Sequence, residues 1–354
     1  MKRNLLIIGI ITWILVIAFV IIIGVLSVNA TSHLIKEELI SMQDIHSIIL
    51  HDDRNSIEIV TTNAAEARVC QYGKKGTMPK KLFNISFANG CATINCKSDF
   101  ILFDLWTLNE KIVIELPASW IGNVEINSSS GGINIKDSFS WKDVSLNCNS
   151  GGIRIAQGLT AENLNISDSS GGIKVNGEIT VDGKINVYNN SGGINFHMPI
   201  KATDVYIKAS SGRIKLGDVN VSNLDLVNSS GGIKLGEITA HTFSLTNASG
   251  SINVAGITGT GNIKASSGGI NIKLNDPVGK VDLSSKSGSI KISVDESIDF
   301  GFNGECTSGS IRANFPLQKN NNGNKASAIM GSDPVATITA KTTSGGISIK
   351  WEEN

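Results

Sequence analysis

Proline and aromatic residues are both scarce in this chain of 354 residues, which has six prolines and only 5% Phe, Trp and Tyr. A core built around large rings is therefore excluded, and the many Val, Ile, Leu and Gly residues suit thin β-layers instead. Net charge is absent as well, because 31 Lys and Arg balance 31 Asp and Glu. No overall field attracts nucleic acid or an acidic membrane, so we expect no nucleic-acid partner and look for local charged patches.

Residue groupings that support catalysis or metal binding are also missing from the sequence. None of the five histidines stands with Cys, Asp or Glu at a metal-ligand spacing; they are His33, His46, His51, His197 and His241. We therefore expect no metal, no cofactor and no enzymatic activity. A polysaccharide-acting β-helix enzyme is the lowest-ranked alternative, because such enzymes place clustered acidic or basic residues in a groove lined by long loops.

A long hydrophobic segment lies near the start of the chain. Leu5 to Val28 is a run of 24 residues without a charge, and a helix of that length is about 36 Å long, enough to cross a bilayer. Two basic residues precede the run, which favours a cytoplasmic N-terminus. We expect residues 1–30 to form a cytoplasmic tip and a signal-anchor helix, with a single-pass, extracytoplasmic domain after it. The alternative is a cleaved signal peptide, since Val28 and Ala30 would satisfy a small-residue cleavage site.

Five cysteines fall in the part of the chain that this topology places outside the cytoplasm, where disulfides persist. An odd number leaves at least one thiol free or paired between chains. Cys91 and Cys96 are close enough in sequence to close a small loop, and the pairing of Cys70 with either stays open. Cys148 and Cys306 are too many repeats apart to pair within one molecule.

The tetrapeptide Ser-Gly-Gly-Ile, or a close variant, recurs eleven times and dominates the sequence. Its landmark isoleucines are Ile133, Ile153, Ile173, Ile194, Ile214, Ile233, Ile252, Ile270, Ile290, Ile311 and Ile347. Their spacing is 18 to 21 residues except for the last, which is 36. Aliphatic residues alternate with polar ones on both sides of each tetrapeptide, which is the period of β-strands. The sequence predicts an all-β fold, a parallel β-solenoid of about eleven coils of roughly 20 residues each.

The first glycine of the tetrapeptide is present in every copy, which predicts a tight turn that needs a positive φ. These glycines are Gly131, Gly151, Gly171, Gly192, Gly212, Gly231, Gly250, Gly268, Gly288, Gly309 and Gly345. The second position is less constrained, since it is Arg213 in one copy and serine in three others. Only the first position is therefore predicted to be a structural requirement of the turn.

The two ends of the repeat array differ from its middle. Residues 31–120 lack the repeat and are predicted to be a linker and a β-rich cap over the first coil. Strand-like runs within it are Ile45–Leu50, Ser56–Thr61, Leu82–Phe87 and Lys111–Leu116. Residues 121–354 form the predicted solenoid, in which the Asn-, Gly- and Lys-rich segment 316–334 is an insertion into the last coil.

The residue directly after each landmark isoleucine points outward and is basic in six of the eleven copies and acidic in none. We call these six residues the basic ribbon: Arg154, Lys174, Lys215, Lys234, Lys291 and Arg312. One coil apart, they suit a linear polyanion such as an envelope polymer, or lipid headgroups. The alternative is that long basic side chains keep a sheet face soluble and discourage edge pairing.

The order of these segments resembles a known bacterial family. A strand pair reading IHSIILHDDRNSIEIV precedes the passage LPASWIGNVEINSSSGGINI and then serial Ser-Gly-x-Ile coils. This is similar to the envelope-associated β-strand-repeat domains of unknown function labelled "putative adhesin", over about Ile45 to Lys350. The resemblance implies a surface β-solenoid and, for some relatives, proximity to envelope-stress signalling. Members often carry an acidic residue where this chain has Gly132 or Gly152, so a metal site is disfavoured here.

Together these features predict a membrane-anchored, extracytoplasmic β-solenoid that acts without catalysis as a structural or adhesin-like binding module at the cell envelope. The membrane, through Leu5 to Val28, is one expected partner, and an anionic envelope polymer or an envelope membrane protein is another. The main alternative is a regulatory partner of an envelope-stress sensing complex. Ligand identity and oligomeric state stay open at this point.

Overall fold

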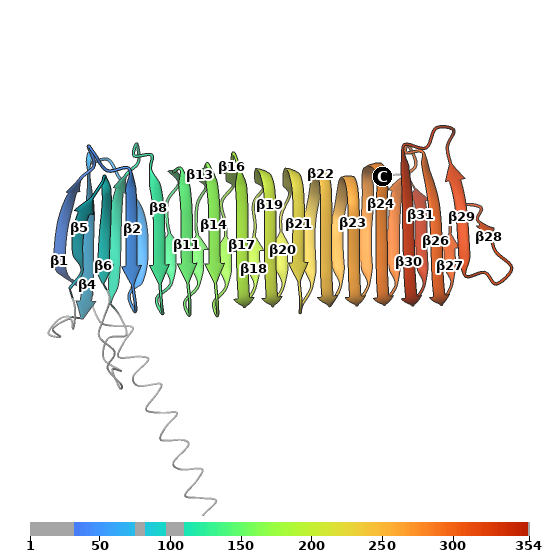
Figure 1. The fold of residues 1–354 in the computed structure, drawn as a ribbon, viewed down its shortest axis with the longest axis horizontal. Coiled ribbons are helices and arrows are strands. Elements are labelled where there is room, and N and C mark those ends of the chain that lie inside the picture. The colour runs from blue at the N-terminus through green and yellow to red at the C-terminus, as the bar shows by residue number, and fades with distance from the viewer. Residues whose placement is uncertain (1–31, 75–81, 97–109, 353–354) are drawn as a thin grey trace, which may run out of the picture.

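The computed structural model describes residues 32–74, 82–96 and 110–352, and these residues form β-strands, turns and bends without a helix. Figure 1 shows the strands side by side along one rod, with the chain advancing from end to end. The predicted all-β fold of repeated parallel strands is therefore confirmed. The expected membrane-spanning segment, Leu5 to Val28, lies outside the described residues. Within the described part of the chain, no helix of sufficient length and hydrophobicity to cross a bilayer is found.

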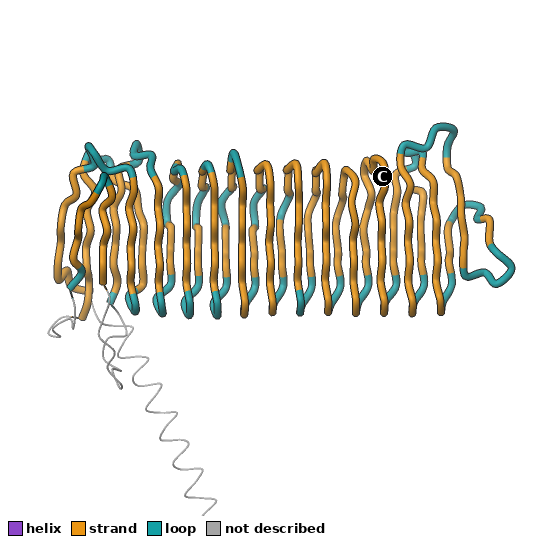
Figure 2. The backbone as a smooth tube through the Cα atoms, in the orientation of Figure 1, coloured by secondary structure: helices purple, strands orange, loops and turns teal. Residues whose placement is uncertain are grey.

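Each coil has a leading strand, a corner at the Ser-Gly turn, a landmark strand and, in many coils, a third short strand (Figure 2). The separate leading strands are β8 (Asn123–Ser128), β11 (Asp143–Cys148), β14 (Asn163–Asp168), β17 (Lys184–Ser191), β19 (Ile200–Ser211) and β21 (Val219–Asn228). The landmark strands between them are β9 (Ile133–Ile135), β12 (Ile153–Ile155), β15 (Ile173–Val175), β18 (Ile194–Phe196) and β20 (Ile214–Leu216). The third strands are β10 (Phe139–Ser140), β13 (Leu159–Ala161) and β16 (Ile179–Val181).

Further along, landmark and leading segments merge into long strands that bend around the corners. These are β22 (Ile233–Ser249), β23 (Ile252–Ser267) and β24 (Ile270–Ser287). Every strand in this middle part pairs in parallel with its counterpart in the next coil, as Ile153 does with Ile173. Equivalent residues of successive repeats are therefore register partners, so the spacing of the repeats sets how the strands pair.

The core is a single aliphatic column inside the coils. Alternate residues of each strand point inward, so Ile155, Leu146 and Ile166 have no exposed surface while their neighbours are half-buried or exposed. Each coil contributes only a few such residues, too few to offset the conformational entropy of about twenty ordered residues. Stacking on both neighbouring coils supplies the remaining burial and the backbone hydrogen bonds.

The N-terminal region contributes two more coils of its own rather than only a cap. β2 (Ser47–Asp52) and β3 (Ser56–Thr62) form one coil, and β6 (Cys91–Cys96) and β7 (Lys111–Pro117) contribute the strands of another. The β2–β3 coil is wedged between β6–β7 and β8–β9, because β2 pairs with β6 and β8 and β3 pairs with β7 and β9. The earliest coil in sequence is thus second in the stack.

Antiparallel strands cover this end of the rod. β5 (Asn84–Ala88) pairs with β6, β4 (Glu66–Lys74) pairs with β7, and β1 (Ser32–Ser41) pairs with β4. The strand-like runs expected from Leu82 and from Lys111 correspond to β5 and β7, whereas β1, β4 and β6 were not predicted. The outermost strands shield the core of the first coil from solvent, as a capped solenoid requires.

At the C-terminal end the last coil in the sequence is likewise inserted between two other coils. Its strands are β25 (Ile290–Asp295), β26 (Phe300–Ser308), β27 (Ile311–Ala313), β28 (Gln318–Lys319), β29 (Lys325–Met330), β30 (Ala336–Ser344) and β31 (Ile347–Glu352). The final coil, β30–β31, lies between β24–β25 and β26–β27, as its position in Figure 1 also shows. The segment 316–334 therefore leaves the outermost coil, and its strands β28 and β29 add antiparallel edges there.

All five cysteines are free thiols. Cys91 and Cys96 lie at opposite ends of β6, about 17 Å apart at the usual rise per residue, so the small loop considered from sequence does not form. Cys148 lies near one end of the stack and Cys306 in the outermost coil at the other end. Their predicted inability to pair is confirmed.

Candidate functional site

The Ser-Gly corners set the positions of all outward side chains, and their geometry explains the glycine. Gly250 has φ 106° and a Cβ built there would lie 2.2 Å from the carbonyl oxygen of Gly231 in the preceding coil. Eight of the eleven first glycines have such a positive φ, whereas Gly131, Gly151 and Gly171 do not. In those three copies a Cβ still collides with backbone of the neighbouring coil. The close approach of neighbouring coils therefore requires glycine in every copy. In eight of the eleven copies the positive φ requires it as well.

A column of polar side chains fixes the same corners from inside. The amide nitrogens of Asn189, Asn228 and Asn247 donate to the glycine carbonyls of the preceding coils at 2.9–3.1 Å. Ser285 and Thr342 make the same contact with their hydroxyl groups. These residues stand five positions before their landmark isoleucines, where the sequence suggested only a small side chain. The hydrogen bonds lock adjacent corners together, so the outward rows stay aligned.

The basic ribbon is brought into one row by this alignment. Its spatial order along the landmark strands is Asn134, Arg154, Lys174, Asn195, Lys215, Lys234, Asn253, Asn271, Lys291, Ser348, Arg312. Two adjacent basic pairs result, Arg154–Lys174 and Lys215–Lys234, at the spacing of neighbouring strands, about 4.8 Å. Lys291 and Arg312 are separated by Ser348 because the last coil is wedged between them.

The charges of the ribbon are not neutralised by nearby acids. All six side chains are exposed, and within the described ranges none of them forms an ion pair with a carboxylate. Glu58 begins the row beside Asn134, but it is held by Lys111 at 3.2 Å and Lys136 at 2.9 Å. Like charges one strand apart repel, so this row gains most by binding an anion.

A shallow groove lies at the centre of the ribbon, with a volume of about 520 Å³. Its lining includes Lys234, Arg213, Ser249, Ser251 and Asn253, together with the backbone of the glycine turns. Arg213 occupies the second glycine position of its copy and adds a third cation beside Lys215 and Lys234. From the sequence, Arg213 indicated only that the second position of the turn tolerates substitution, although a cation in place of glycine was the available signal.

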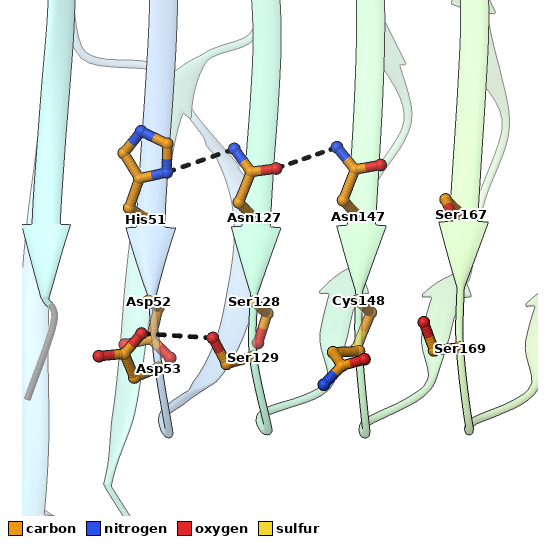
Figure 3. Close-up of a pocket in the computed structure, with 11 residues that line it drawn as sticks. His51, Asp52, Asp53, Asn127, Ser128, Ser129, Asn147, Cys148, Ser167 and Ser169 are labelled. Atoms are coloured by element: carbon orange, nitrogen blue, oxygen red, sulfur yellow. Dashed lines mark hydrogen bonds between the residues drawn. The ribbon is translucent and has the colours of Figure 1, made fainter. Parts of the chain in front are cut away.

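A second groove lies on the outer face of the leading strands near the N-terminal end, with a volume of about 470 Å³. Figure 3 shows His51, Asn127 and Asn147 side by side in its wall, with Asp52 and Asp53 below them. Asp52 is almost fully buried, and burial raises the pKa of its carboxyl to about 6. Asp53 accepts a hydrogen bond from Ser129 Oγ at 3.3 Å.

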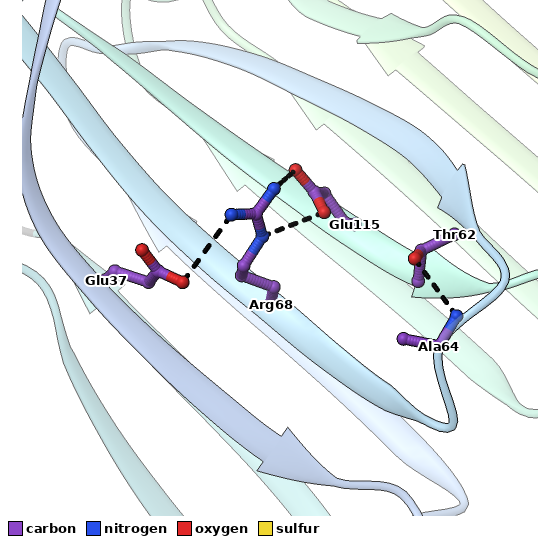
Figure 4. A network of polar contacts seen from close by, with 5 residues as sticks. All are labelled: Glu37, Thr62, Ala64, Arg68 and Glu115. Carbon is purple, nitrogen blue, oxygen red and sulfur yellow. Dashed lines mark hydrogen bonds and ion pairs between the residues drawn. The ribbon is translucent and has the colours of Figure 1, made fainter.

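An ion network on the N-terminal cap is structural. Arg68 on β4 donates through Nε to Glu115 on β7 at 2.9 Å and lies 3.5 Å from Glu37 on β1 (Figure 4). The network therefore ties together the three strands β1, β4 and β7, which close this end of the rod. Because these side chains are partly exposed, the contribution of each pair to stability is small.

The histidines are dispersed in the structure. His46 and His51 lie near the N-terminal end, His197 follows β18, and His241 lies within β22. Across residues 32–74, 82–96 and 110–352, no group of three or more His, Cys, Asp or Glu side chains is placed to hold a metal ion.

Stacked parallel coils with antiparallel edge strands at both ends define an all-β repeat protein. The chain belongs to the Toastrack family of domains of unknown function, DUF4097, whose family model matches residues 45–181 and 178–350. The two matches overlap at residues 178–181 and together span residues 45–350. The resemblance to β-strand-repeat domains seen in the sequence is confirmed.

Three solved structures are similar over most of their length. A putative adhesin from Parabacteroides merdae is 12% identical and has a TM-score of 0.38, covering 92% of this chain and 98% of its own. A putative adhesin from Bacteroides fragilis is 14% identical with a TM-score of 0.28, covering 90% and 97%. A putative cell adhesion protein from Clostridium sporogenes is 10% identical with a TM-score of 0.17, covering 90% and 99%.

At these identities and TM-scores the three structures give no information about what this chain binds. No curated protein matches the chain.

Proposed function

We propose that the protein is a non-catalytic binding module of the cell envelope, and that the basic ribbon holds a linear polyanion along the rod. The single observation that carries the proposal is the in-register row of exposed, unpaired basic side chains. Binding releases counterions condensed on the polyanion, and the gain grows with the number of its charges that the basic side chains neutralise. A rigid row suits a repeating polymer because each charge meets an equivalent group of the ligand.

The membrane anchor is part of this proposal. Leu5 to Val28 is hydrophobic enough to span a bilayer, and the rod then follows on the extracytoplasmic side. In this position the ribbon meets the anionic polymers of the envelope. The module acts as an adhesin-like or structural tether, with the anchor at one end and the polymer along its side.

The test compares two variants that lose the same charge. In the ribbon variant, Arg154, Lys174, Lys215 and Lys234 are changed to serine. In the control, exposed lysines off the ribbon are changed to serine: Lys142, Lys208, Lys264 and Lys286. Binding of the full chain in detergent to inorganic polyphosphate is measured by calorimetry at physiological ionic strength.

We expect the ribbon variant to lose affinity by at least about tenfold and the control to lose much less. Equal losses in both variants would show that only total charge matters, and unchanged binding in the ribbon variant would remove the proposal.

A further inference from the structure

Two of the three tyrosines of this chain lie together on an outer face. Tyr188 on β17 and Tyr206 on β19 have ring centroids 5.6 Å apart with an angle of 53° between the rings. Tyr188 is 45% exposed. Two neighbouring rings on an outer face offer flat apolar surface on which a ligand can stack, and this chain has few other aromatics.

Each tyrosine ends a row of uncharged polar side chains that runs across neighbouring coils. The first row passes through Asn127, Asn147 and Ser167 to Tyr188. The second passes through Ser145, Asn165 and Asn186 to Tyr206. We call these eight residues the tyrosine strip.

The amides of the strip are already oriented by one another. Asn147 Nδ2 donates to Asn127 Oδ1 at 3.0 Å, as Figure 3 shows, and Asn186 Nδ2 donates to Asn165 Oδ1 at 2.9 Å. Asn147 Nδ2 also donates to Ser145 Oγ at 3.1 Å and Asn127 Nδ2 to Glu125, so these two amides offer a ligand mainly oxygen lone pairs, whereas Asn165 and Asn186 use one polar atom each in their shared bond. The result is a preorganised ladder of donors and acceptors with one rung per coil.

The strip differs from the basic ribbon in charge as well as in position. None of its eight members is a lysine, arginine or carboxylate, and the groove at its start is lined mainly by amide and hydroxyl groups. The acids nearby are Glu125, which accepts from Asn127 Nδ2 at 2.7 Å, Asp52 and Asp53 at the corner, and Asp225, which lies directly beyond Tyr206 in the second row. The nearest lysine in the first row is Lys208, directly beyond Tyr188. A polyanion therefore finds no cation within the strip.

We propose that the tyrosine strip binds one uncharged, extended, linear glycan, lying across the coils with its rings along the two rows. The hydroxyl groups of a sugar match the exposed amides and Ser167, and the apolar face of a pyranose ring stacks on Tyr188 or Tyr206. A β-1,4-linked chain advances per ring by a distance close to the spacing of strands, about 4.8 Å. Because successive rings of such a chain are flipped relative to one another, equivalent faces of the sugar meet every second coil.

The test uses cellohexaose and N-acetylchitohexaose as probes, with glucose as the monomer. Binding to the full chain in detergent is measured by calorimetry in high salt, where contacts of the ribbon with anions are screened. The variants are Tyr188→Ala, Tyr188→Phe and Asn165→Ala. Asn262→Ala is the matched control, because Asn262 is an exposed asparagine in the second row's register but outside the strip.

We expect at least one hexasaccharide to bind much more tightly than glucose. Tyr188→Ala lowers its affinity about tenfold or more, and Asn165→Ala lowers it several-fold. Tyr188→Phe, which keeps the ring, and Asn262→Ala leave it nearly unchanged. The ribbon variant retains glycan binding, which separates this proposal from the preceding one.

Two results would overturn the proposal. One is the absence of binding by both hexasaccharides, and the other is binding that Tyr188→Ala leaves unaltered while the variant keeps its thermal unfolding temperature. Loss of polyphosphate affinity in Tyr188→Ala, without any glycan binding, would instead assign the strip to an anion and would equally reject it.

Discussion

Ile290 on β25 is the register partner of Ile347 on β31, although Ile311 is the next landmark isoleucine in the sequence. The last coil has entered the stack between two coils that precede it. Its strands therefore have a parallel neighbour on both sides, while the coil before it becomes the outermost one. The last described strand, β31, is thereby held within the rod rather than exposed at its tip.

This arrangement predicts an unusual response to truncation. Ending the chain after Pro334 removes β30 and β31 and leaves β27, which pairs only with β31, without a partner. We expect amide hydrogens in Phe300–Ala313 to exchange at least about a hundredfold faster, a change of about 3 kcal/mol in local opening free energy. Residues 133–254 serve as the internal control in the same exchange experiment. Retained protection in Phe300–Ala313 would mean that the outermost coil closes the gap unaided.

The two glycines of the repeat are predicted to differ sharply in their tolerance of alanine. At Gly250 a Cβ meets the Gly231 carbonyl oxygen at 2.2 Å and φ is positive, whereas at Gly232 the nearest atom is 3.4 Å away. Gly250→Ala should lower the free energy of unfolding by about 2–3 kcal/mol. Gly232→Ala should lower it by less than about 1 kcal/mol. Urea unfolding followed by circular dichroism gives both values, and similar losses would argue against the close approach of coils.

The buried carboxyl of Asp52 is predicted to make stability depend on pH in an unusual direction. Its pKa rises from 3.8 to about 6 because burial disfavours the charged form. The folded state therefore binds a proton more tightly than the unfolded state, and this group's contribution to stability increases as the pH falls from about 7 to 5. We expect this contribution of Asp52 to raise the free energy of unfolding by about 1 kcal/mol between pH 7 and pH 5.

The free energy of unfolding is measured by urea unfolding at pH 7 and at pH 5. Asp52→Asn removes the titrating carboxyl, so the difference between the two values should be smaller in the variant than in the wild type. Asp44→Asn is the control, since Asp44 is an exposed acid near the same end of the rod. An unchanged difference in Asp52→Asn would show that the carboxyl titrates normally.

The middle of the rod could be predicted from the sequence because the repeat itself encodes the register. Equal spacing of Ile133, Ile153 and Ile173 leaves one parallel alignment that keeps every inward residue in the core. The β2–β3 coil was harder to recognise, since its corner lacks the Ser-Gly signature. There Asp52 accepts from the backbone nitrogen of Asn55 at 2.6 Å and forms the turn by different chemistry.

The wedged ends could not be predicted for a related reason. A gap of 36 residues before Ile347 is compatible with an interrupted coil or with a chain that returns into the stack, and local sequence does not distinguish them. The positions of the basic ribbon followed from the period. Arg213 carried a sequence signal, a cation in place of glycine, but the lack of acidic partners for the ribbon among the described residues follows only from the arrangement of neighbouring coils.

The salt dependence of polyphosphate binding shows directly whether the basic ribbon holds the polyanion. The logarithm of the binding constant is plotted against the logarithm of the salt concentration for wild type, the ribbon variant and its charge-matched control. If Arg154, Lys174, Lys215 and Lys234 engage the polyanion, the slope becomes shallower by about three in the ribbon variant and by less than about one in the control. An equal slope in wild type and ribbon variant would contradict the account.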